Sequence, residues 1–393
     1  MKMIIPNDVL ELMHVLRNNG FECYVVGGAI RSFLLDLPIH DYDLTTNATP
    51  QQMQQRFKGY KTIETGLQHG TLTVLSGKRP VEITTYRKDA TYQDHRHPDA
   101  VEFTSSIQED CARRDFTINA LCYNDEQGLL DFYNGQQDIK NHVVRCIRNP
   151  KERFNEDALR ILRAIRFASR LGFTIEENTS REIFANKQLL HYVSIERIQE
   201  ELKGILISPN CASFLNAYKE VFAIFLPQLE QLPSFNTLVA SLQNSTPNYI
   251  VRLALLFTNF SNVDEELKRM KYSKVIQKEV LSCITQKEAQ LNTKIELRHF
   301  LSNYAFNFET YLEYRYALNQ KINKAQILTW YREIQDNHDC ISLKQLTING
   351  SDLKQLGYQG KQISDTLKQL LDAIIEEKVS NTKNDLQNYL KKD

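Results

Sequence analysis

Short runs in which apolar and polar residues alternate dominate the first third of the chain. Alternation with a period of two is typical of strands that bury one face, and here glycine and proline separate the runs between about residues 21 and 123. The runs are ECYVVGG, HDYDLTT, TLTVLSG, VEITTYR and INALCYN. TLTVLSG and RPVEITTYR flank the turn residues Ser76-Gly77-Lys78, which predicts an antiparallel hairpin. Thr49-Pro50 ahead of QQMQQRF predicts a capped helix start.

The pattern changes after Asn149-Pro150. From there almost to the C-terminus, apolar residues recur with a period near 3.6, which indicates amphipathic helices. Proline, asparagine and glycine interrupt the pattern at 208–210, 232–234 and 347–350. The predicted fold class is therefore α+β, a mixed α/β domain followed by an all-helical remainder, with boundaries near residues 150, 207 and 335.

Composition narrows the kind of protein. The 393 residues are 42% hydrophobic and 24% charged, which predicts two or more domains. Lysine plus arginine equals aspartate plus glutamate at 48 each, so any nucleic-acid surface must be a local basic patch. Seven cysteines without a CxxC pair favour buried thiols in a reducing compartment. The first twenty residues carry charges within an amphipathic period, so we expect no membrane segment and a cytoplasmic protein.

Asp41 and Asp43 are the first candidates for chemistry. Residues two apart in a strand point to the same face, so HDYDLTT would place both carboxylates together and Tyr42 opposite them. Two adjacent carboxylates repel unless a cation bridges them, and hard oxygen ligands suit Mg²⁺. A pair of such ions can stabilise the attacking and leaving oxygens of a phosphoryl transfer. The alternative, commoner for an isolated Asp-x-Asp, is a solvated strand end.

The segment VVGGAIR favours the functional interpretation. Gly27 and Gly28 would let a phosphate approach backbone amides where a strand runs into a helix, and Arg31 adds positive charge one turn later. The alternative is a tight strand-to-helix turn. Glu82 lies on the outward face of the strand VEITTYR and is a candidate third catalytic carboxylate, although an outward glutamate is usually only solvated.

Four arginines mark a predicted helix from Glu156 to Arg170. They fall within one broad arc, and Asp157 lies one turn before the first of them. The arginines are Arg160, Arg163, Arg166 and Arg170. A solvated face with salt bridges inside the helix would explain the same pattern.

An aspartate and an arginine together have a specific chemical use. Cytosine and adenine both present an exocyclic amine beside a ring-nitrogen acceptor, whereas guanine and uracil present the reverse order. Asp157 could accept from the amine while Arg160 donates to the ring nitrogen, which would select C and A. A good bidentate contact is worth roughly 1–3 kcal/mol of discrimination. Arg163 and Arg166 would then lie further along the nucleotide.

These motifs together resemble a known family. They are GGAIR, DYDLTT, HGT at 69–71, EITTYR, RRDFTINA at 113–120, the Asp131…Gly135…Asp138 pattern, Glu156-Asp157…Arg160 and SIERI at 194–198 with Glu201-Leu202. They resemble the tRNA nucleotidyltransferases, the bacterial-type (class II) CCA-adding enzymes that share a catalytic head with bacterial poly(A) polymerases. The resemblance is strong over about residues 20–206 and returns at 346–361.

The resemblance implies site residues and a reaction. It implies that Asp41 and Asp43 bind Mg²⁺, that three residues touch the incoming nucleotide, and that four read or support its base. The first three are Gly28, Arg31 and Arg114; the four are Asp157, Arg160, Arg163 and Arg166. The implied reaction is attack of the tRNA 3′-hydroxyl on the α-phosphate of CTP or ATP, with release of pyrophosphate.

The resemblance also implies an organisation of the chain and partners. It predicts a nucleotidyltransferase head at 1–149, a helical neck at 150–206, a helical body at 207–334 and a helical tail at 335–393. The tRNA would then lie against local basic faces of the helical parts, where the Gly357-x-x-Gly360-Lys361 turn and Lys203 are candidate contacts.

Other functions stay open at this point. An enzyme that adds only the terminal A, or a poly(A) polymerase, would carry the same head. Family members that add only two cytidines typically lack part of the loop that is complete here at 89–98, which favours a chain able to add A. A non-enzymatic RNA-binding module is the alternative from another class, and the intact Asp41, Asp43 and Arg114 argue against it.

Overall fold

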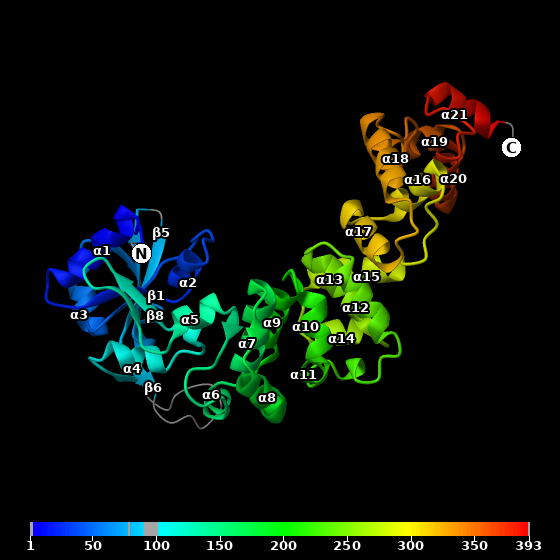
Figure 1. Cartoon of the computed structure of the whole chain (residues 1–393). Helices are drawn as coiled ribbons and strands as arrows, with labels where there is room; N and C mark the ends of the chain where they lie inside the picture. Colours follow the sequence, from blue (N-terminus) through cyan, green and yellow to red (C-terminus); the bar gives the residue numbers. More distant parts are fainter. Residues whose placement is uncertain (1–2, 78, 90–100, 392–393) are drawn as a thin grey trace. The chain divides into compact units, whose positions relative to one another are not determined.

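The computed structural model describes residues 3–77, 79–89 and 101–391, which form two compact units. The first extends to Pro233 and the second begins at Ser234. Figure 1 shows strands in the blue-to-green part of the chain, and helices alone in the described part of the second unit. This agrees with the predicted α+β class. The four-part division of the chain stays a prediction.

A seven-stranded mixed sheet forms the centre of the first unit, in the order β3-β4-β5-β2-β1-β8-β9. Its strands are β1 (Cys23–Val26), β2 (Asp43–Thr46), β3 (Lys61–Ile63), β4 (Thr71–Ser76), β5 (Arg79–Thr85), β8 (Leu121–Asn124) and β9 (Gly128–Asp131). Two further pairs are β6 (Arg87–Asp89) with β7 (Val101–Phe103), and β10 (Val143–Val144) with β11 (Thr174–Ile175). The small strand β11 is an exception to the all-helical remainder predicted after residue 150.

Helices of the first unit surround and follow this sheet. Helix α1 (Asn7–Arg17) precedes β1, helices α2 (Gly28–Leu34), α3 (Pro50–Arg56) and α4 (Ile107–Ala112) lie between strands of the sheet, and α5 (Gly135–Lys140) comes directly after β9. Those that follow are α6 (Pro150–Glu156), α7 (Arg160–Leu171), α8 (Glu177–Asn186), α9 (Ile195–Leu206), α10 (Cys211–Ala217) and α11 (Lys219–Ala223). Helices α7 and α9 pack against each other.

The second unit is helical throughout its described residues. Its helices are α12 (Phe235–Gln243), α13 (Tyr249–Phe257), α14 (Val263–Arg269), α15 (Lys274–Thr285), α16 (Lys294–Asn303), α17 (Phe308–Leu318), α18 (Lys324–Asp336), α19 (Gly350–Gln355), α20 (Lys361–Ile375) and α21 (Lys383–Leu390). None of the helices described in either unit combines the length and apolar character needed to cross a membrane.

Local sequence rules explain two elements of the sheet domain. The predicted hairpin is confirmed, because β4 and β5 pair antiparallel from Thr71 opposite Thr84 to Ser76 opposite Arg79. The predicted start of α3 is also confirmed, since the Thr49 hydroxyl accepts a bond from the Gln52 amide and proline occupies the first helical position.

The central strands meet where the candidate chemistry lies. Strand β1 is buried along its whole length, and β2 separates it from β5. In this register Asp43 lies opposite Val26 on β1 and beside Glu82 on the parallel strand β5. The end of β1 and the start of β2 therefore share one edge of the sheet.

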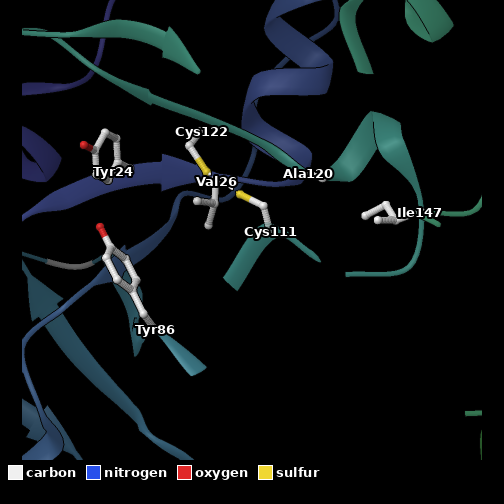
Figure 2. Close-up of a cluster of buried hydrophobic side chains, with 7 residues drawn as sticks. All are labelled: Tyr24, Val26, Tyr86, Cys111, Ala120, Cys122 and Ile147. Atoms are coloured by element: carbon white, nitrogen blue, oxygen red, sulfur yellow. Dashed lines mark hydrogen bonds between the residues drawn. The ribbon is translucent and has the colours of Figure 1, made fainter. Parts of the chain in front are cut away.

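A compact apolar cluster packs on β1 below that edge. Figure 2 shows Cys111 of α4 and Cys122 of β8 beside Val26, and their sulfur atoms lie 3.1 Å apart. All seven cysteines are buried free thiols, as predicted. The cluster fixes the end of α4, which carries the next residues of the site.

Candidate active site

Strand β1 ends in a glycine turn at the edge of the sheet. Gly27 has φ +67° and ψ −124°, a conformation that residues with a side chain rarely adopt, and α2 begins at Gly28. A Cβ at Gly27 would lie 3.6 Å from Nη1 of Arg114, and one at Gly28 would lie 3.6 Å from Nη2 of Arg31. The turn therefore places two guanidinium groups against bare backbone.

The two aspartates lie next to this turn. Asp43 is the first residue of β2 and Asp41 precedes the strand, so only one of the pair belongs to the observed strand. Both residues are exposed, whereas Tyr42 between them is buried. The burial pattern agrees with the predicted alternation, in which the carboxylates share one side of the backbone.

Asp43 lies in an unfavourable place for an isolated carboxylate. Although the residue is exposed at the surface, the surrounding protein keeps water from its carboxylate and raises its pKa, and the carboxylates of Glu82 and Asp41 raise the pKa further against the opposing effect of Arg114. A bound cation would relieve this repulsion, and carboxylate oxygens suit a divalent metal ion. Within residues 3–77, 79–89 and 101–391, no group of three or more His, Cys, Asp or Glu side chains is arranged to hold a metal. The aspartate pair offers two hard oxygen donors of the kind that suit a divalent cation.

Arg114 is held in place by a buried carboxylate. Its Nη2 donates to Oδ2 of Asp110 over 3.0 Å, and Asp110 is fully buried. Burial alone would raise the pKa of Asp110, but Arg113 and Arg114 outweigh that effect and hold the pKa below its usual range. The Nε of Arg114 is buried and has no hydrogen-bond partner among the described residues. A donor of this kind suits an anionic ligand.

Arg31 is positioned through a chain of three side chains. Asn119 accepts a bond from Nη1 of Arg31 and donates to Oδ1 of Asp115 over 2.9 Å. The other oxygen of Asp115 accepts from Nε and Nη2 of Arg163 at 2.8 and 2.6 Å. Burial alone would raise the pKa of Asp115, but Arg163 and the Asn119 bond lower it to about 2. The chain connects the sheet edge to helix α7.

The predicted continuous helix from Glu156 to Arg170 is wrong at its start. Helix α6 ends at Glu156 and α7 begins at Arg160. Asp157 between them is extended, with φ −140°, and its Oδ1 accepts the amide of Leu159 over 3.1 Å. An aspartate side chain that bonds a nearby amide competes with the helix, which explains the break.

The side chains of Asp157 and Arg160 each have partners elsewhere in the first unit. Nη2 of Arg197 on α9 donates to both oxygens of Asp157, at 3.2 and 2.9 Å. Arg160 is buried and donates to Oε2 of Glu156 over 2.6 Å and to the carbonyl of Arg113 over 3.0 Å. The two side chains are therefore held by different partners.

Two arginines of α7 and Arg31 of α2 gather around one aromatic ring. The guanidinium carbons of Arg31, Arg163 and Arg166 lie 4.9, 5.5 and 4.3 Å from the ring centroid of Phe167. Nε of Arg166 also donates to Oε2 of Glu201 on α9 over 2.5 Å. Phe167 therefore spaces three cations that would otherwise repel.

One cleft of about 370 Å³ unites most of these residues. It is lined by Gly27, Gly28, Arg31, Asp43, Arg113, Arg114, Asp115, Asn119, Asp157, Arg160, Arg163 and Phe167. Seven of the predicted site residues are among them. Asp41, Glu82 and Arg166 do not line the cleft, although Glu82 and Asp41 act on the charge of Asp43.

Sequence reasoning assigned no role to several residues of the cleft. Asp115 and Asn119 stand in the quoted RRDFTINA segment, so their motif was recognised but their function in holding Arg31 and Arg163 was not. Phe167 follows Arg163 by four residues and so lies on the same face of the helix. That spacing was the available signal for an aromatic ring among the arginines.

Family comparisons match successive parts of this chain. Residues 23–145 match the poly A polymerase head domain, 172–232 match the probable RNA and SrmB-binding site of polymerase A, and 241–390 match the putative tRNA nucleotidyltransferase domain 2. The CCA-adding enzyme of Ligilactobacillus salivarius is 35% identical over 405 residues, which cover 99% of this chain and 97% of that protein. The chain belongs to the CCA-adding enzyme family.

Further relatives of this CCA-adding enzyme agree over the whole length. The CCA-adding enzyme of Staphylococcus haemolyticus is 33% identical, over 98% of this chain and 97% of that one. The crystal structure of the Bacillus stearothermophilus CCA-adding enzyme in complex with CTP superposes with a TM-score of 0.84 at 27% identity, covering 99% of this chain and 98% of that chain. The Thermotoga maritima enzyme complexed with tRNA, at 21% identity and a TM-score of 0.73, shares the fold.

Proposed function

We propose that this CCA-adding enzyme adds C, C and A to the 3′ end of tRNA, using CTP and ATP. The tRNA 3′-hydroxyl attacks the α-phosphate, a new phosphodiester bond forms, and pyrophosphate leaves with the electrons of the broken bond. One observation carries the proposal. A single cleft joins an acidic strand end, a glycine turn between two arginines, and an aspartate–arginine pair suited to a base edge.

The cleft has a phosphate end and a base end. Gly28 leaves room for a phosphate beside the backbone, and Arg31 and Arg114 reach the same turn from separate elements. The unpartnered Nε of Arg114 offers a donor to the triphosphate. At the other end, Asp157 and Arg160 face the cleft from the connection between α6 and α7. The nucleotide would span the distance between them.

Asp41 and Asp43 would hold the divalent cation, which we propose to be Mg²⁺. A bound ion of this kind supplies charge stabilisation for the reacting phosphate and activates the attacking hydroxyl. The aspartates contribute two hard oxygen donors, and their mutual repulsion supports a site made for a cation. We retain Glu82 as a third catalytic carboxylate, since it lies beside Asp43 across the sheet.

Base choice would follow from fixed donors and acceptors. The Asp157 carboxylate accepts from the exocyclic amine of C or A, and Arg160 donates to the adjacent ring nitrogen. Arg163 and Arg166, held by Asp115 and Glu201, support the base end through Phe167. Uracil and guanine would set acceptor against acceptor, which costs about 1–3 kcal/mol per mismatch.

The helical parts would bind the tRNA, and we retain the four-part division at 149, 206 and 334. The Gly357–Gly360 turn has φ +93° and +50° at its two glycines and leads into α20, which supports a backbone contact there. A cytoplasmic location would fit the seven buried thiols. The loop 89–98, which bears on addition of A, lies almost entirely outside the described residues.

Alanine at Asp43 tests the catalytic assignment. We expect Asp43→Ala to lower incorporation of CMP into a tRNA transcript lacking CCA by about 10³-fold or more, because it removes a ligand of the reacting centre. The unfolding midpoint should stay close to that of the native chain. Asp125→Ala is the matched control, since Asp125 pairs with Arg17 outside the cleft. Turnover that survives in Asp43→Ala would contradict the assignment.

A further inference from the structure

The Asp157 carboxylate is held by a residue behind the cleft. Arg197 is the third residue of α9, and its Nη2 donates to both carboxylate oxygens, at 3.2 and 2.9 Å. Asp157 lines the cleft and Arg197 does not. An effect of Arg197 on a bound base must therefore pass through Asp157.

The second terminal nitrogen of Arg197, Nη1, helps to show what fixes the position of the guanidinium group. Nη1 of Arg197 is buried and has no hydrogen-bond partner among the described residues. A buried donor without an acceptor costs free energy, so the side chain is not placed to satisfy all of its donors. Among the described residues its hydrogen bonds are those to Asp157, which indicates that this pair sets the orientation of both groups.

The bonds already made leave Asp157 with limited freedom. Oδ1 accepts from the Leu159 amide and from Arg197, whereas Oδ2 accepts only from Arg197 among the described residues. A carboxylate oxygen can accept two bonds, so Oδ2 retains one acceptor position. The direction of that remaining position is set by Arg197 on one side and by the Leu159 amide on the other.

We propose that Arg197 is a positioning residue that determines base selectivity by locking the Asp157 carboxylate with one acceptor turned to the cleft. This inference rests on the proposed function, in which Asp157 reads the exocyclic amine. A locked carboxylate accepts from the amine of C or A and repels the carbonyl of U or G. A carboxylate free to rotate can turn away from that carbonyl, so the penalty against U and G falls.

Arg197→Met tests this inference through selectivity. The assay is incorporation of a single nucleotide into a tRNA transcript lacking CCA, with CTP and UTP separately. We expect the ratio of kcat/KM for CTP to that for UTP to fall on the order of 10-fold, the size of one good base contact. Arg197→Lys keeps a donor and should restore part of the ratio. If Arg197→Met fails to fold, Arg197→Gln removes the charge while keeping a polar side chain, and an unchanged ratio in that variant overturns the inference.

Arg145→Met is the matched control. One nitrogen of Arg145, Nε, donates to both oxygens of Asp138, at 3.2 and 3.1 Å, so a single arginine nitrogen holds this carboxylate too, but away from the cleft. It should leave the CTP-to-UTP ratio unchanged even if stability falls. An equal loss of ratio in Arg145→Met and Arg197→Met would assign the effect to general destabilisation and overturn the inference.

Asp157→Asn separates this inference from the proposed function. If Arg197 acts through Asp157, the double variant should show the ratio of Asp157→Asn alone, with no further loss from Arg197→Met. An unchanged ratio in Asp157→Asn would mean that Asp157 does not read the base, and the proposed base reading fails. A ratio that changes in Asp157→Asn but not in Arg197→Met removes only the role of Arg197.

Discussion

Asp115 contributes both to the stability of the first unit and to the arrangement of side chains in its cleft. Asp115 is nearly inaccessible, yet its pKa is held at about 2 because Arg163 and Asn119 favour the carboxylate form against burial. The same side chain holds Arg31 in place through Asn119. A single carboxylate therefore serves packing and also helps to hold an arginine of the cleft in place.

Asp115→Asn should reveal both effects. Removing the charge takes from Arg163 the closer of its two carboxylate partners, so we expect a loss of about 2–4 kcal/mol in the free energy of unfolding at pH 7. The native pKa is lowered, so the stabilisation is complete above the unfolded value of 3.8 and is lost as the pH falls through about 2. Urea unfolding at pH 7, 4 and 2.5 measures this.

The difference in free energy of unfolding between the native chain and Asp115→Asn should therefore be smaller at pH 2.5 than at pH 7. A difference that stays constant with pH would contradict the charge assignment. Asp138→Asn is the control, because Asp138 is also buried beside an arginine but lies outside the cleft. It should lose stability while nucleotide affinity stays unchanged, whereas Asp115→Asn should lose both.

At the residue scale, the sequence was informative where function depends on residue type and short spacing. The Asp pair, the glycine turn and the arginines of α7 were recognisable because each lies within a few positions of its partner. Arg197 and Glu201 were not assigned to Asp157 and Arg166, because those pairs span about 40 and 35 residues. Only the packing of α9 on α7 brings them together.

At the scale of elements, the turn between β1 and α2 is the feature that most depends on one residue type. Gly27 adopts φ +67° and ψ −124°, which costs a residue with a Cβ about 1–3 kcal/mol. A Cβ there would meet Nη1 of Arg114 at ordinary contact distance, so the backbone and not a clash is the obstacle. The turn therefore sets the phosphate end of the cleft.

Gly27→Ala should relax that turn and raise KM for CTP by about 10-fold, because the phosphate end loses its shape. Gly20→Ala is the control: Gly20 has φ +82°, nothing lies within 4 Å of an added Cβ, and it is outside the cleft. Both variants should unfold at lower temperature, while only Gly27→Ala should raise KM. Equal KM values in the two variants would contradict the role proposed for the turn between β1 and α2.

The sequence correctly predicted elements that depend on neighbouring residues, but it did not predict the break in the helix at Asp157. The β4–β5 hairpin and the Thr49 cap follow from neighbouring residues alone. The continuous helix predicted through Asp157 did not form, because its side chain bonds the Leu159 amide and also the distant Arg197. The helical period shows that the arginines share one face, but it does not reveal a side chain whose hydrogen bond to the backbone interrupts the helix.

At the scale of the molecule, the chain separates into two compact units at Pro233 and Ser234. The change from strand to helix patterning was visible in the sequence, since it depends on the period of apolar residues. The interruption at 232–234 was also visible, but the sequence did not distinguish it as the boundary between compact units, because that depends on which helices pack together, and a helix of either unit has the same amphipathic period. The cleft lies wholly within the first unit.

The products formed on tRNA transcripts test the central claim most directly. Transcripts ending before CCA, after C and after CC would each be incubated with the purified protein, Mg²⁺ and all four nucleotides, and their 3′ ends sequenced. One cleft that selects C and A should complete every transcript to CCA and then stop. Addition of A alone, a run of A residues, or U and G at these positions would contradict it.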